Sequence, residues 1–406
     1  MTKPKILWLS DSPITNTGYA TISRNILNGI SDEFECHYMG HNFVGQNFNP
    51  RGIKFNDGSE LNFHIIGAGR EAYCKDLIAP MINKIQPDFF IILLDTFMVY
   101  PWIMDFNFSP AKSIFYFPSD GGACLPLGCE NVLKHMYHSI AMAKFGQEQA
   151  KQVHGINTDY IPHAVDVRNY FPVSDTEKKQ YKQDYEVITV SGSKVKGALK
   201  DKFVVGCVSR NQGRKMLDRM IKSFPLFCKD KPDAVLLLHS DPYDGAAIFN
   251  IIELIKRYNL ENRVFFSDIK FYSNFEYKDM NKVYNVMDVF FLPTSGEGFG
   301  VPIIEAMACE VPVVVTDFTT TKELVLDNGQ CGYAAGLQTD LTGSWNVERG
   351  IMDIQHAAVC LNKLYNNKEL RKQFGACGRE KVIKYYNWDI VLKQWKSTLR
   401  RLLCQN

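Results

Sequence analysis

Short, unbroken apolar runs alternate with amphipathic stretches along most of the chain. Because the runs lack polar alternation, they are typical of strands covered on both faces of a sheet. We expect strands at 6–10, 89–94, 113–117, 203–208, 234–239, 263–266, 289–292 and 311–315. Apolar residues at three-to-four spacing predict helices at 20–30, 72–85, 130–138, 216–228, 246–258, 278–287, 303–308 and 388–403.

The order strand, helix, strand indicates βαβ units and parallel sheets. It occurs in two series, which begin near Lys5 and Phe203, and the polar stretch 172–202 between them is typical of a linker with a mobile loop. We therefore predict an α/β fold of two doubly wound, Rossmann-like domains with a boundary near residue 170. Ligands are expected in an interdomain cleft, at the carboxyl ends of the strands.

Composition excludes some classes of protein. The 406 residues suit two or three domains, and a net charge of +2 gives no global electrostatic case for binding nucleic acid or an anionic membrane. The apolar runs are shorter than the ~18 residues of a membrane span, and the first is too short for a signal peptide. Eleven scattered cysteines suit reduced thiols. We expect a soluble cytoplasmic protein, with peripheral membrane contact left open.

One group of cysteines and histidines loosely imitates a zinc site: Cys124, Cys129, His135 and His138. The spacing between the histidines is shorter than usual for zinc ligands. Two buried thiols and two ordinary histidines are the favoured interpretation, so no metal site is predicted.

The stretch DVFFLPTSGEGFGVPIIEAMACEVPVVVTD, residues 288–317, carries the strongest chemical signal. A strand is followed by a glycine-rich loop, and Pro302 fits the first turn of a helix. The free N–H groups and dipole of a helix N-terminus suit a phosphate, and glycines allow close approach. Glu297 and Glu305 border this anion site, where carboxylates suit sugar hydroxyls. The alternative is a helix N-terminus with only a structural role.

A second constellation follows the strand at 203–208. Arg210 and Lys215 lie in the turn after it, where two cations can neutralise a diphosphate leaving group. Arg214 adjoins them and is a candidate for the same role. A solvated charge pair is the alternative.

These motifs resemble retaining glycosyltransferases of family 4, which have the two-Rossmann GT-B architecture. Glu297 and Glu305 form the E-x7-E pattern of that family, and Arg210 and Lys215 resemble its Arg…Lys pair. The chain departs from the family where it has Met216 and Glu310 in place of glycines. The resemblance implies three parts: an acceptor-binding domain at 1–170, a nucleotide-sugar-binding domain at 171–385, and a terminal helix at 386–406 that packs back on the first domain.

The resemblance also implies site roles. Glu305 would hold the ribose and Glu297 the transferred sugar, with catalytic roles for Glu297, Arg210 and Lys215. Further donor contacts are expected from Ser209, Gly298, Phe299, Gly300 and Val301.

Three more candidates lie in the first half of the chain. Gly18 resembles the N-terminal glycine loop of the family, with an ordinary turn as the alternative. Asp120 stands where many members have a histidine near the reacting sugar, which implies a catalytic role in orienting a donor-sugar hydroxyl or the acceptor. A simple Asp-Gly turn is the alternative. His163 lies in a segment like Pro-His-Gly-Val-Asp, with Ala164 replacing the glycine, and either contacts the donor or is a packed histidine.

The expected activity is transfer of a hexose, glucose or mannose or a relative, from a UDP- or GDP-linked donor to a hydroxyl group. No metal is expected, because the sequence has no D-x-D triplet. The acceptor is left open among glycan, lipid, protein, small molecule and, less favoured, a modified DNA base. Competing hypotheses are a nucleotide-sugar 2-epimerase and a catalytically silent binding protein. A dehydrogenase is disfavoured because Gly18 lacks a G-x-G-x-x-G context.

Overall fold

The computed structural model describes residues 2–15, 17–42, 61–122, 125–267 and 277–405. The chain divides into two compact units. Unit 1 comprises residues 1–164, 344–347 and 388–406, and unit 2 comprises residues 165–343 and 348–387. The sequence placed the boundary near 170, and it did not anticipate that four residues from the second half would belong to unit 1.

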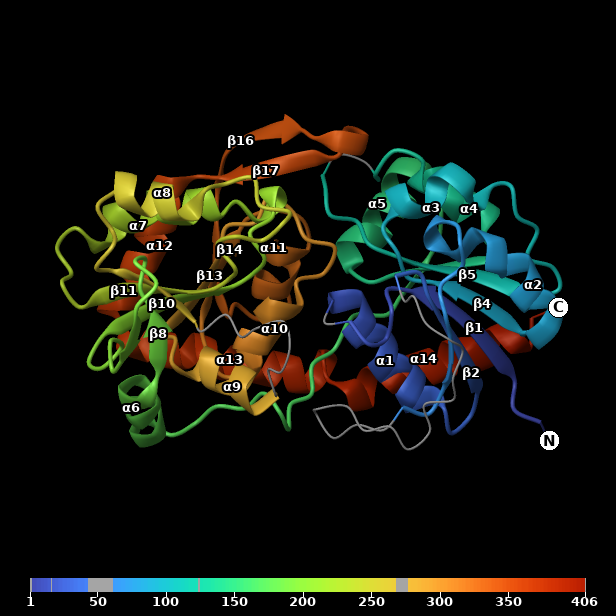
Figure 1. Ribbon diagram of the computed structural model, residues 1–406, viewed down its shortest axis with the longest axis horizontal. Coiled ribbons are helices and arrows are strands. Elements are labelled where there is room, and N and C mark those ends of the chain that lie inside the picture. Colours follow the sequence, from blue (N-terminus) through green and yellow to red (C-terminus); the bar gives the residue numbers. More distant parts are fainter. Residues whose placement is uncertain (1, 16, 43–60, 123–124, 268–276, 406) are drawn as a thin grey trace. The chain divides into compact units, whose positions relative to one another are not determined.

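Unit 1 contains a seven-stranded sheet with the order β3-β2-β1-β4-β5-β6-β7, and its strand pairs are all parallel (Figure 1). This is the doubly wound order, which reverses between β1 and β4. The strands are β1 (Lys5–Ser10), β2 (Glu35–Gly40), β3 (His64–Ile66), β4 (Phe89–Ile92), β5 (Lys112–Phe117), β6 (His138–Ala141) and β7 (Asp159–Tyr160). The helices are α1 (Gly18–Ile30), α2 (Lys75–Ile85), α3 (Thr96–Ile103), α4 (Cys129–His135), α5 (Lys144–His154) and α14 (Trp388–Leu403).

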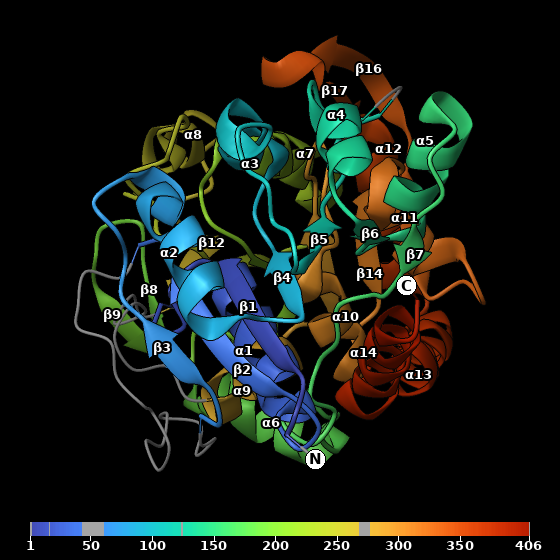
Figure 2. The same ribbon diagram turned by 90° about the vertical axis from the view of Figure 1, so that its right-hand side faces the viewer.

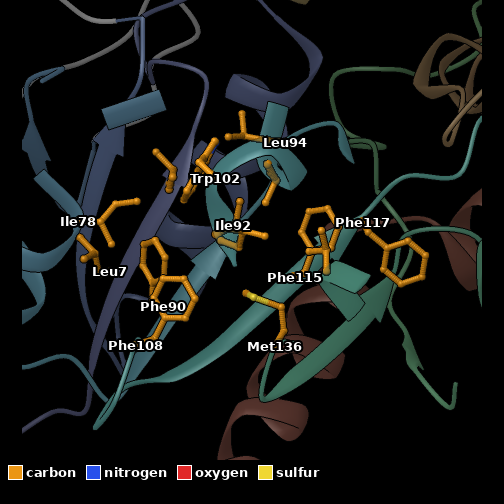
Figure 3. Packing of buried hydrophobic residues seen from close by; sticks show 14 of the residues in the cluster. Leu7, Ile78, Phe90, Ile92, Leu94, Trp102, Phe108, Phe115, Phe117 and Met136 are labelled. Atoms are coloured by element: carbon orange, nitrogen blue, oxygen red, sulfur yellow. The ribbon is translucent and has the colours of Figure 1, made fainter. Parts of the chain in front are cut away.

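The core of unit 1 forms because the central strands are apolar on both faces. On one face, Leu7, Phe90, Ile92 and Phe115 pack with residues of the covering helices, among them Trp102 of α3 (Figure 3). Burying such side chains contributes roughly 1.5–3 kcal/mol each. The sequence pattern predicted this burial directly.

The last helix, α14, completes unit 1. Trp395 of α14 is fully buried, with its ring centroid 5.7 Å from that of Trp8 in β1 and 5.0 Å from that of Tyr116 in β5. Basic residues of α14 bind carboxylates of the same unit: Lys396 Nζ lies 2.7 Å from Asp32 Oδ2, and Arg400 Nε lies 2.7 Å from Glu33 Oε2. The amphipathic pattern alone favoured a merely solvated face, because it does not reveal these partners.

Unit 2 contains an eight-stranded sheet with the order β15-β14-β13-β10-β11-β12-β8-β9, parallel from β15 to β12 and antiparallel beyond. The strands are β8 (Glu186–Ile188), β9 (Lys194–Lys196), β10 (Phe203–Val208), β11 (Ala234–His239), β12 (Val264–Ser267), β13 (Val289–Leu292), β14 (Val313–Thr316) and β15 (Gly332–Ala335), with a separate hairpin of β16 (Leu337–Thr342) and β17 (Glu348–Met352). The helices are α6 (Asp175–Asp184), α7 (Leu217–Cys228), α8 (Ile251–Arg257), α9 (Tyr277–Asn285), α10 (Val301–Ala308), α11 (Thr319–Leu326), α12 (Ile354–Asn366) and α13 (Lys368–Tyr385).

The stretch 172–202, expected to be a linker with a mobile loop, is ordered. It contains α6 and the β8–β9 hairpin, which extends the sheet at the β12 edge. A capping box starts α6: Ser174 Oγ accepts from the N–H of Glu177, whose carboxylate accepts from the N–H of Ser174. Polar composition misled the prediction because α6 and β9 are largely exposed elements.

No helix in the described part of the chain is long and apolar enough to cross a membrane.

Candidate functional site

The predicted donor loops meet at the point where the strand order of unit 2 reverses. Strands β10 and β13 are neighbours and parallel, so their carboxyl ends lie side by side. Residues 209–216 follow β10, and residues 293–300 follow β13 and lead into α10. Ligands of doubly wound folds bind at such a reversal of strand order.

Helix α10 begins as the sequence predicted. Its N-cap, Gly300, has φ 101°, a conformation that favours glycine, and Pro302 lies in the first turn. No described side chain caps this end. Pro302 has no N–H, and the Ile303 N–H donates to the Gly300 carbonyl at 2.9 Å. This end therefore offers an anion the Val301 N–H and the positive end of the helix dipole.

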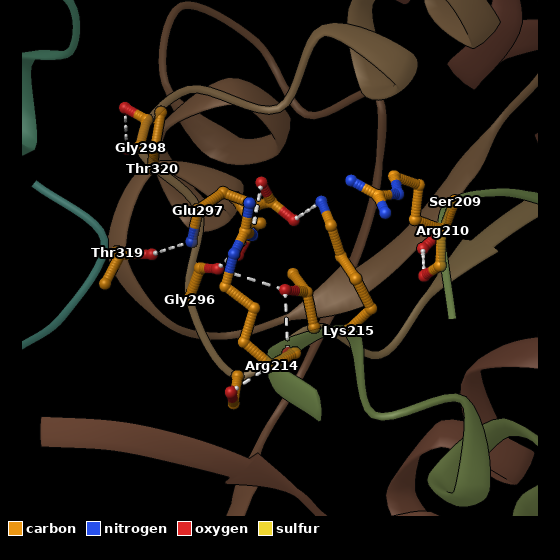
Figure 4. Close-up of polar contacts among 12 residues, drawn as sticks. Ser209, Arg210, Arg214, Lys215, Gly296, Glu297, Gly298, Thr319 and Thr320 are labelled. Atoms are coloured by element: carbon orange, nitrogen blue, oxygen red, sulfur yellow. Dashed lines mark hydrogen bonds and ion pairs between the residues drawn. The ribbon is translucent and has the colours of Figure 1, made fainter. Parts of the chain in front are cut away.

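Glu297 is the centre of an ion-paired triad (Figure 4). Its Oε2 lies 2.9 Å from Arg214 Nη1, and its Oε1 accepts a hydrogen bond from Lys215 Nζ. The Glu297 side chain is 5% exposed and that of Lys215 12% exposed. Two cations and one carboxylate leave the triad with one net positive charge next to the start of α10.

The charges of the triad set its protonation. Burial alone would raise the pKa of Glu297, but Arg214 and Lys215 outweigh that effect and lower it to about 2. Burial and the neighbouring Arg214 lower the pKa of Lys215, which Glu297 partly opposes. Glu297 is therefore ionised at neutral pH.

Arg210 is oriented by Asp244, a residue that no sequence motif marked as part of the site. Its Nε and Nη2 donate to the two oxygens of Asp244, both at 2.8 Å. Asp244 is 1% exposed at its side chain, whereas Arg210 is 54% exposed. This bidentate pair fixes the guanidinium while leaving much of it open to solvent.

Hydroxyl groups fasten the two loops to each other. Ser295 N–H donates to the Arg214 carbonyl at 2.7 Å, and Thr294 Oγ1 donates to the same carbonyl at 3.2 Å. From the other side, Thr319 Oγ1 accepts from the N–H of Glu297 at 3.2 Å, and Thr320 Oγ1 donates to the Gly298 carbonyl at 3.3 Å (Figure 4). The triad is thus positioned by hydrogen bonds to the backbone of both loops as well as by its ion pairs.

Glu305, in the second turn of α10, is bound by two tyrosines. Tyr284 Oη donates to its Oε2 at 2.5 Å, and Tyr170 also hydrogen-bonds to the carboxylate. Burial raises the pKa of Glu305, and the two hydrogen bonds partly oppose the rise. The sequence pattern predicted a role for Glu305 but carried no signal for either tyrosine.

The remaining predicted donor residues of unit 2 contribute differently. Phe299 is 3% exposed, with its ring centroid 5.8 Å from that of Tyr386, so its side chain serves packing. Gly298 and Val301 flank it and are partly exposed. Ser209 is the first residue after β10, and its hydroxyl donates to the Arg210 carbonyl at 2.9 Å.

The three candidates of the first half of the chain belong to unit 1. Gly18 is the first residue of α1, behind the N-cap Thr17, and open space lies where a Cβ would project from it. Asp120 follows β5 and is partly exposed. His163 is 4% exposed, its ring centroid lies 5.5 Å from that of Tyr116, and burial lowers its pKa to about 3. This is the packed arrangement that the sequence left open.

The residues weighed as a zinc site are engaged elsewhere. Cys124 lies outside the described residues. Cys129 is buried, His135 Nε2 lies 3.0 Å from the Phe106 carbonyl, and His138 Nε2 lies 2.8 Å from Asp159 Oδ2.

The positions where the chain lacks a glycine of the resembled family are informative. Met216 has φ 51° and Glu310 has φ 57°, both in the left-handed region. Glycine adopts this conformation without steric cost, whereas other residues are strained by it. The chain therefore keeps the backbone of these two turns without the residue that favours it.

The site residues that the sequence did not predict all lie in ordinary local contexts. Asp244 lies in a polar loop between β11 and α8 that resembles any turn, and Tyr284 lies on the helix α9 where an aromatic residue is usually core. Thr319 and Thr320 begin α11, where threonine is a common helix start. Only the tertiary fold brings these residues to the loops.

Comparison with known proteins finds a sequence match in the second half of the chain. Residues 192–381 match the family model described as glycosyl transferases group 1. The chain is 30% identical over 205 residues to the capsular polysaccharide biosynthesis glycosyltransferase CapM of Staphylococcus aureus, covering 50% of this chain and 48% of CapM. It is 28% identical over 250 residues to a GDP-mannose-dependent mannosyltransferase of Corynebacterium glutamicum, covering 60% and 56%. The chain thus spans about half the length of these curated relatives.

Solved structures extend the likeness to the whole fold. Sucrose-phosphate synthase from Thermosynechococcus elongatus matches 98% of this chain and 99% of its own, with a TM-score of 0.72 and 16% identity. Anabaena HepE in complex with UDP and glucose matches 98% and 100%, with a TM-score of 0.69 and 15% identity. The protein therefore has the GT-B fold, and residues 192–381 are similar in sequence to the group 1 glycosyl transferases.

Proposed function

We propose that this protein is a retaining glycosyltransferase that moves a hexose from a nucleoside diphosphate sugar to a hydroxyl acceptor. The observation that carries the proposal is the triad of Glu297, Arg214 and Lys215 beside the uncapped start of α10. This group offers a diphosphate two cations and the positive end of the α10 dipole, next to an ionised carboxylate for sugar hydroxyls.

Donor binding would rearrange the triad. The diphosphate attracts Lys215 and Arg214 more strongly than a single carboxylate does, because it carries more negative charge. As these cations turn to the diphosphate, Glu297 is released to accept hydrogen bonds from the transferred sugar. Arg210, held by Asp244, supplies a third cation for the leaving group.

Glu305 is proposed to accept hydrogen bonds from the ribose of the donor. Its orientation by Tyr284 and Tyr170 supports this role, because a fixed carboxylate loses less freedom on binding. In this account Asp120 orients a donor-sugar hydroxyl or the acceptor, and Gly18 lets the diphosphate or donor sugar approach closely. No divalent metal takes part.

The donor nucleotide is proposed to be UDP or GDP. One relative carries GDP-mannose in its name, and one solved neighbour binds UDP and glucose. The acceptor stays open among glycan, lipid, protein and small molecule, with a modified DNA base less favoured.

The test is to incubate the full chain with labelled UDP- and GDP-linked glucose and mannose and to separate the products. Slow release of free nucleotide and sugar, lost in Lys215→Ala and kept in Lys222→Ala, supports a transferase. Lys222 is a suitable control because it pairs with Asp218 on α7, outside the triad. An isomerised donor would indicate a 2-epimerase, and binding without turnover would indicate a silent protein.

A further inference from the structure

A group of metal-ligating side chains lies at the edge of the unit 1 sheet, apart from every residue considered above. Strand β3 is the edge strand and pairs in parallel with β2 (Figure 2). Glu35 and His37 are two residues apart on β2 and so point to the same face. His64 of β3 is the register partner of His37.

The three side chains converge. His37 Nε2 lies 2.8 Å from Glu35 Oε1, and the rings of His37 and His64 stack with centroids 4.8 Å apart at 22°. One ligand atom from each of the three residues lies within 4.8 Å of the other two. Within the described part of the chain, this is the only such group of three.

We propose that Glu35, His37 and His64 bind one Zn²⁺ ion, with water as the fourth ligand. Two imidazole nitrogens and one carboxylate oxygen are an established zinc ligand set. Ligand atoms of a tetrahedral zinc site lie roughly 3.3 Å from one another, given bonds of about 2.0–2.1 Å. His37 Nε2 and Glu35 Oε1 already lie within this distance, and the two stacked rings would turn so that one nitrogen of each points at the ion.

The surroundings fit a bound cation of moderate affinity. The His37 side chain is 15% exposed and that of Glu35 39% exposed, so the ligands are partly shielded and still accessible. Lys5 is a nearby positive charge that would repel a bound cation. Its ammonium group donates a hydrogen bond to the Ile85 carbonyl at 3.2 Å.

A bound ion would stabilise the pairing of β3, the short edge strand of the unit 1 sheet, with β2. Strand β3 has only three residues, so few ladder hydrogen bonds hold it to β2. A metal bridging His64 to Glu35 and His37 joins the two strands through their side chains. Because only the folded unit presents all three ligands together, zinc binding would stabilise the folded state.

The experiment titrates Zn²⁺ by calorimetry into the full chain after treatment with EDTA and its removal by dialysis. We expect one equivalent to bind and to raise the melting temperature. In His64→Gln and in Glu35→Gln, the affinity should fall at least 10-fold and the thermal shift should disappear. His154→Gln is the matched control, because His154 pairs with Glu130 on another part of unit 1.

Co²⁺ identifies the ligands independently. The wild type should show the visible spectrum of a tetrahedral nitrogen–oxygen site without an intense thiolate charge-transfer band, because no cysteine takes part. Circular dichroism shows whether each variant is folded. Equal Zn²⁺ affinity in wild type, His64→Gln and Glu35→Gln, or a thiolate spectrum, would overturn the proposal. The readouts are binding and stability, so they do not depend on the proposed glycosyl transfer.

Discussion

Tyr284 and Glu305 are joined by a hydrogen bond of 2.5 Å from the phenol to the carboxylate, between α9 and α10. The Tyr170 hydroxyl hydrogen-bonds to the same carboxylate. The carboxylate proposed to bind the ribose is therefore oriented by hydrogen bonds from two phenol groups. Its charge state depends on them, because burial raises the pKa of Glu305 and the phenols lower it.

Replacement of Tyr284 by Phe should shift the pH dependence of nucleotide binding. In the proposed role, only the carboxylate form of Glu305 accepts hydrogen bonds from the ribose. The nucleotide affinity should therefore be highest above the pKa of Glu305 and should fall as the pH drops through it. Removing the phenol raises that pKa further, so the loss should begin at a higher pH than in the wild type. Calorimetric titration with UDP and GDP across a pH series measures this. Tyr365→Phe is the control, because its partner is Asp233, and coincident acid limbs in Tyr284→Phe and wild type would refute the assignment.

Glu305→Ala and Glu297→Ala should have different consequences. Glu305→Ala should weaken binding of UDP or GDP itself, because hydrogen bonds to a charged group contribute about 1.5–3 kcal/mol each. Glu297→Ala should reduce turnover with little loss of nucleotide affinity, since its proposed partner is the sugar. Calorimetry with free nucleotides, alongside turnover with the intact donor, separates the two. If both variants bind nucleotide like the wild type, the ribose role of Glu305 is wrong.

Loss of a leaving-group cation should slow transfer strongly. Arg210→Ala or Lys215→Ala should lower kcat by about 10²–10³, as is typical for one preorganised charge-stabilising group. Asp244→Asn should cost less, because Arg210 keeps its charge and loses only its orientation. Steady-state kinetics of donor hydrolysis or transfer measures all three. An Asp244→Asn variant slower than Arg210→Ala would show that Asp244 does more than position Arg210.

Transfer should persist in excess EDTA. Three cations and the start of α10 face the diphosphate in the proposed mechanism, so no Mg²⁺ or Mn²⁺ is needed. The rate is measured with and without EDTA, in wild type and in His64→Gln. Activity lost with EDTA and restored by Mg²⁺ or Mn²⁺ would contradict the leaving-group mechanism. A loss that only Zn²⁺ restores, and that His64→Gln reproduces, would instead trace to the edge of the unit 1 sheet.

The sequence predicted the central strands and the start of α10 because each has a strong local signal. Phe203–Val208 is continuously apolar, and the Gly300-Val301-Pro302 turn specifies a helix start. The peripheral strand β2 was missed because Glu35 and His37 interrupt its pattern, and β3 because it is only three residues long. The prediction of site residues was limited in the same way. The glycines around Glu297 mark it in the sequence, whereas Asp244 and Tyr284 reach the site only through contacts with residues distant in sequence.

Relief of left-handed strain should stabilise unit 2. Met216→Gly and Glu310→Gly each remove a cost of roughly 1–2 kcal/mol, offset in part by the greater entropy that glycine loses. The net gain should be about 0.5–1 kcal/mol, seen as a rise of roughly 1–3 °C in melting temperature. Met216→Ala is the control: it removes the side chain but keeps the strain, so a gain as large as that of Met216→Gly would point to packing instead.

The split of unit 1 has a consequence for the order in which the protein can assemble. Val165 and Asn387, where the chain enters and leaves unit 2, form a parallel bridge side by side, so unit 2 is an insertion within unit 1. Trp395, which fills the space beside Trp8 and Tyr116, leaves the ribosome only after all of unit 2 has been made. During synthesis, the apolar surface around Trp8 and Tyr116 therefore stays uncovered until α14 has been made. In a chain of two domains, the N-terminal domain usually folds first during synthesis. Here the order is reversed, because unit 2 can complete its fold while unit 1 still lacks its last helix.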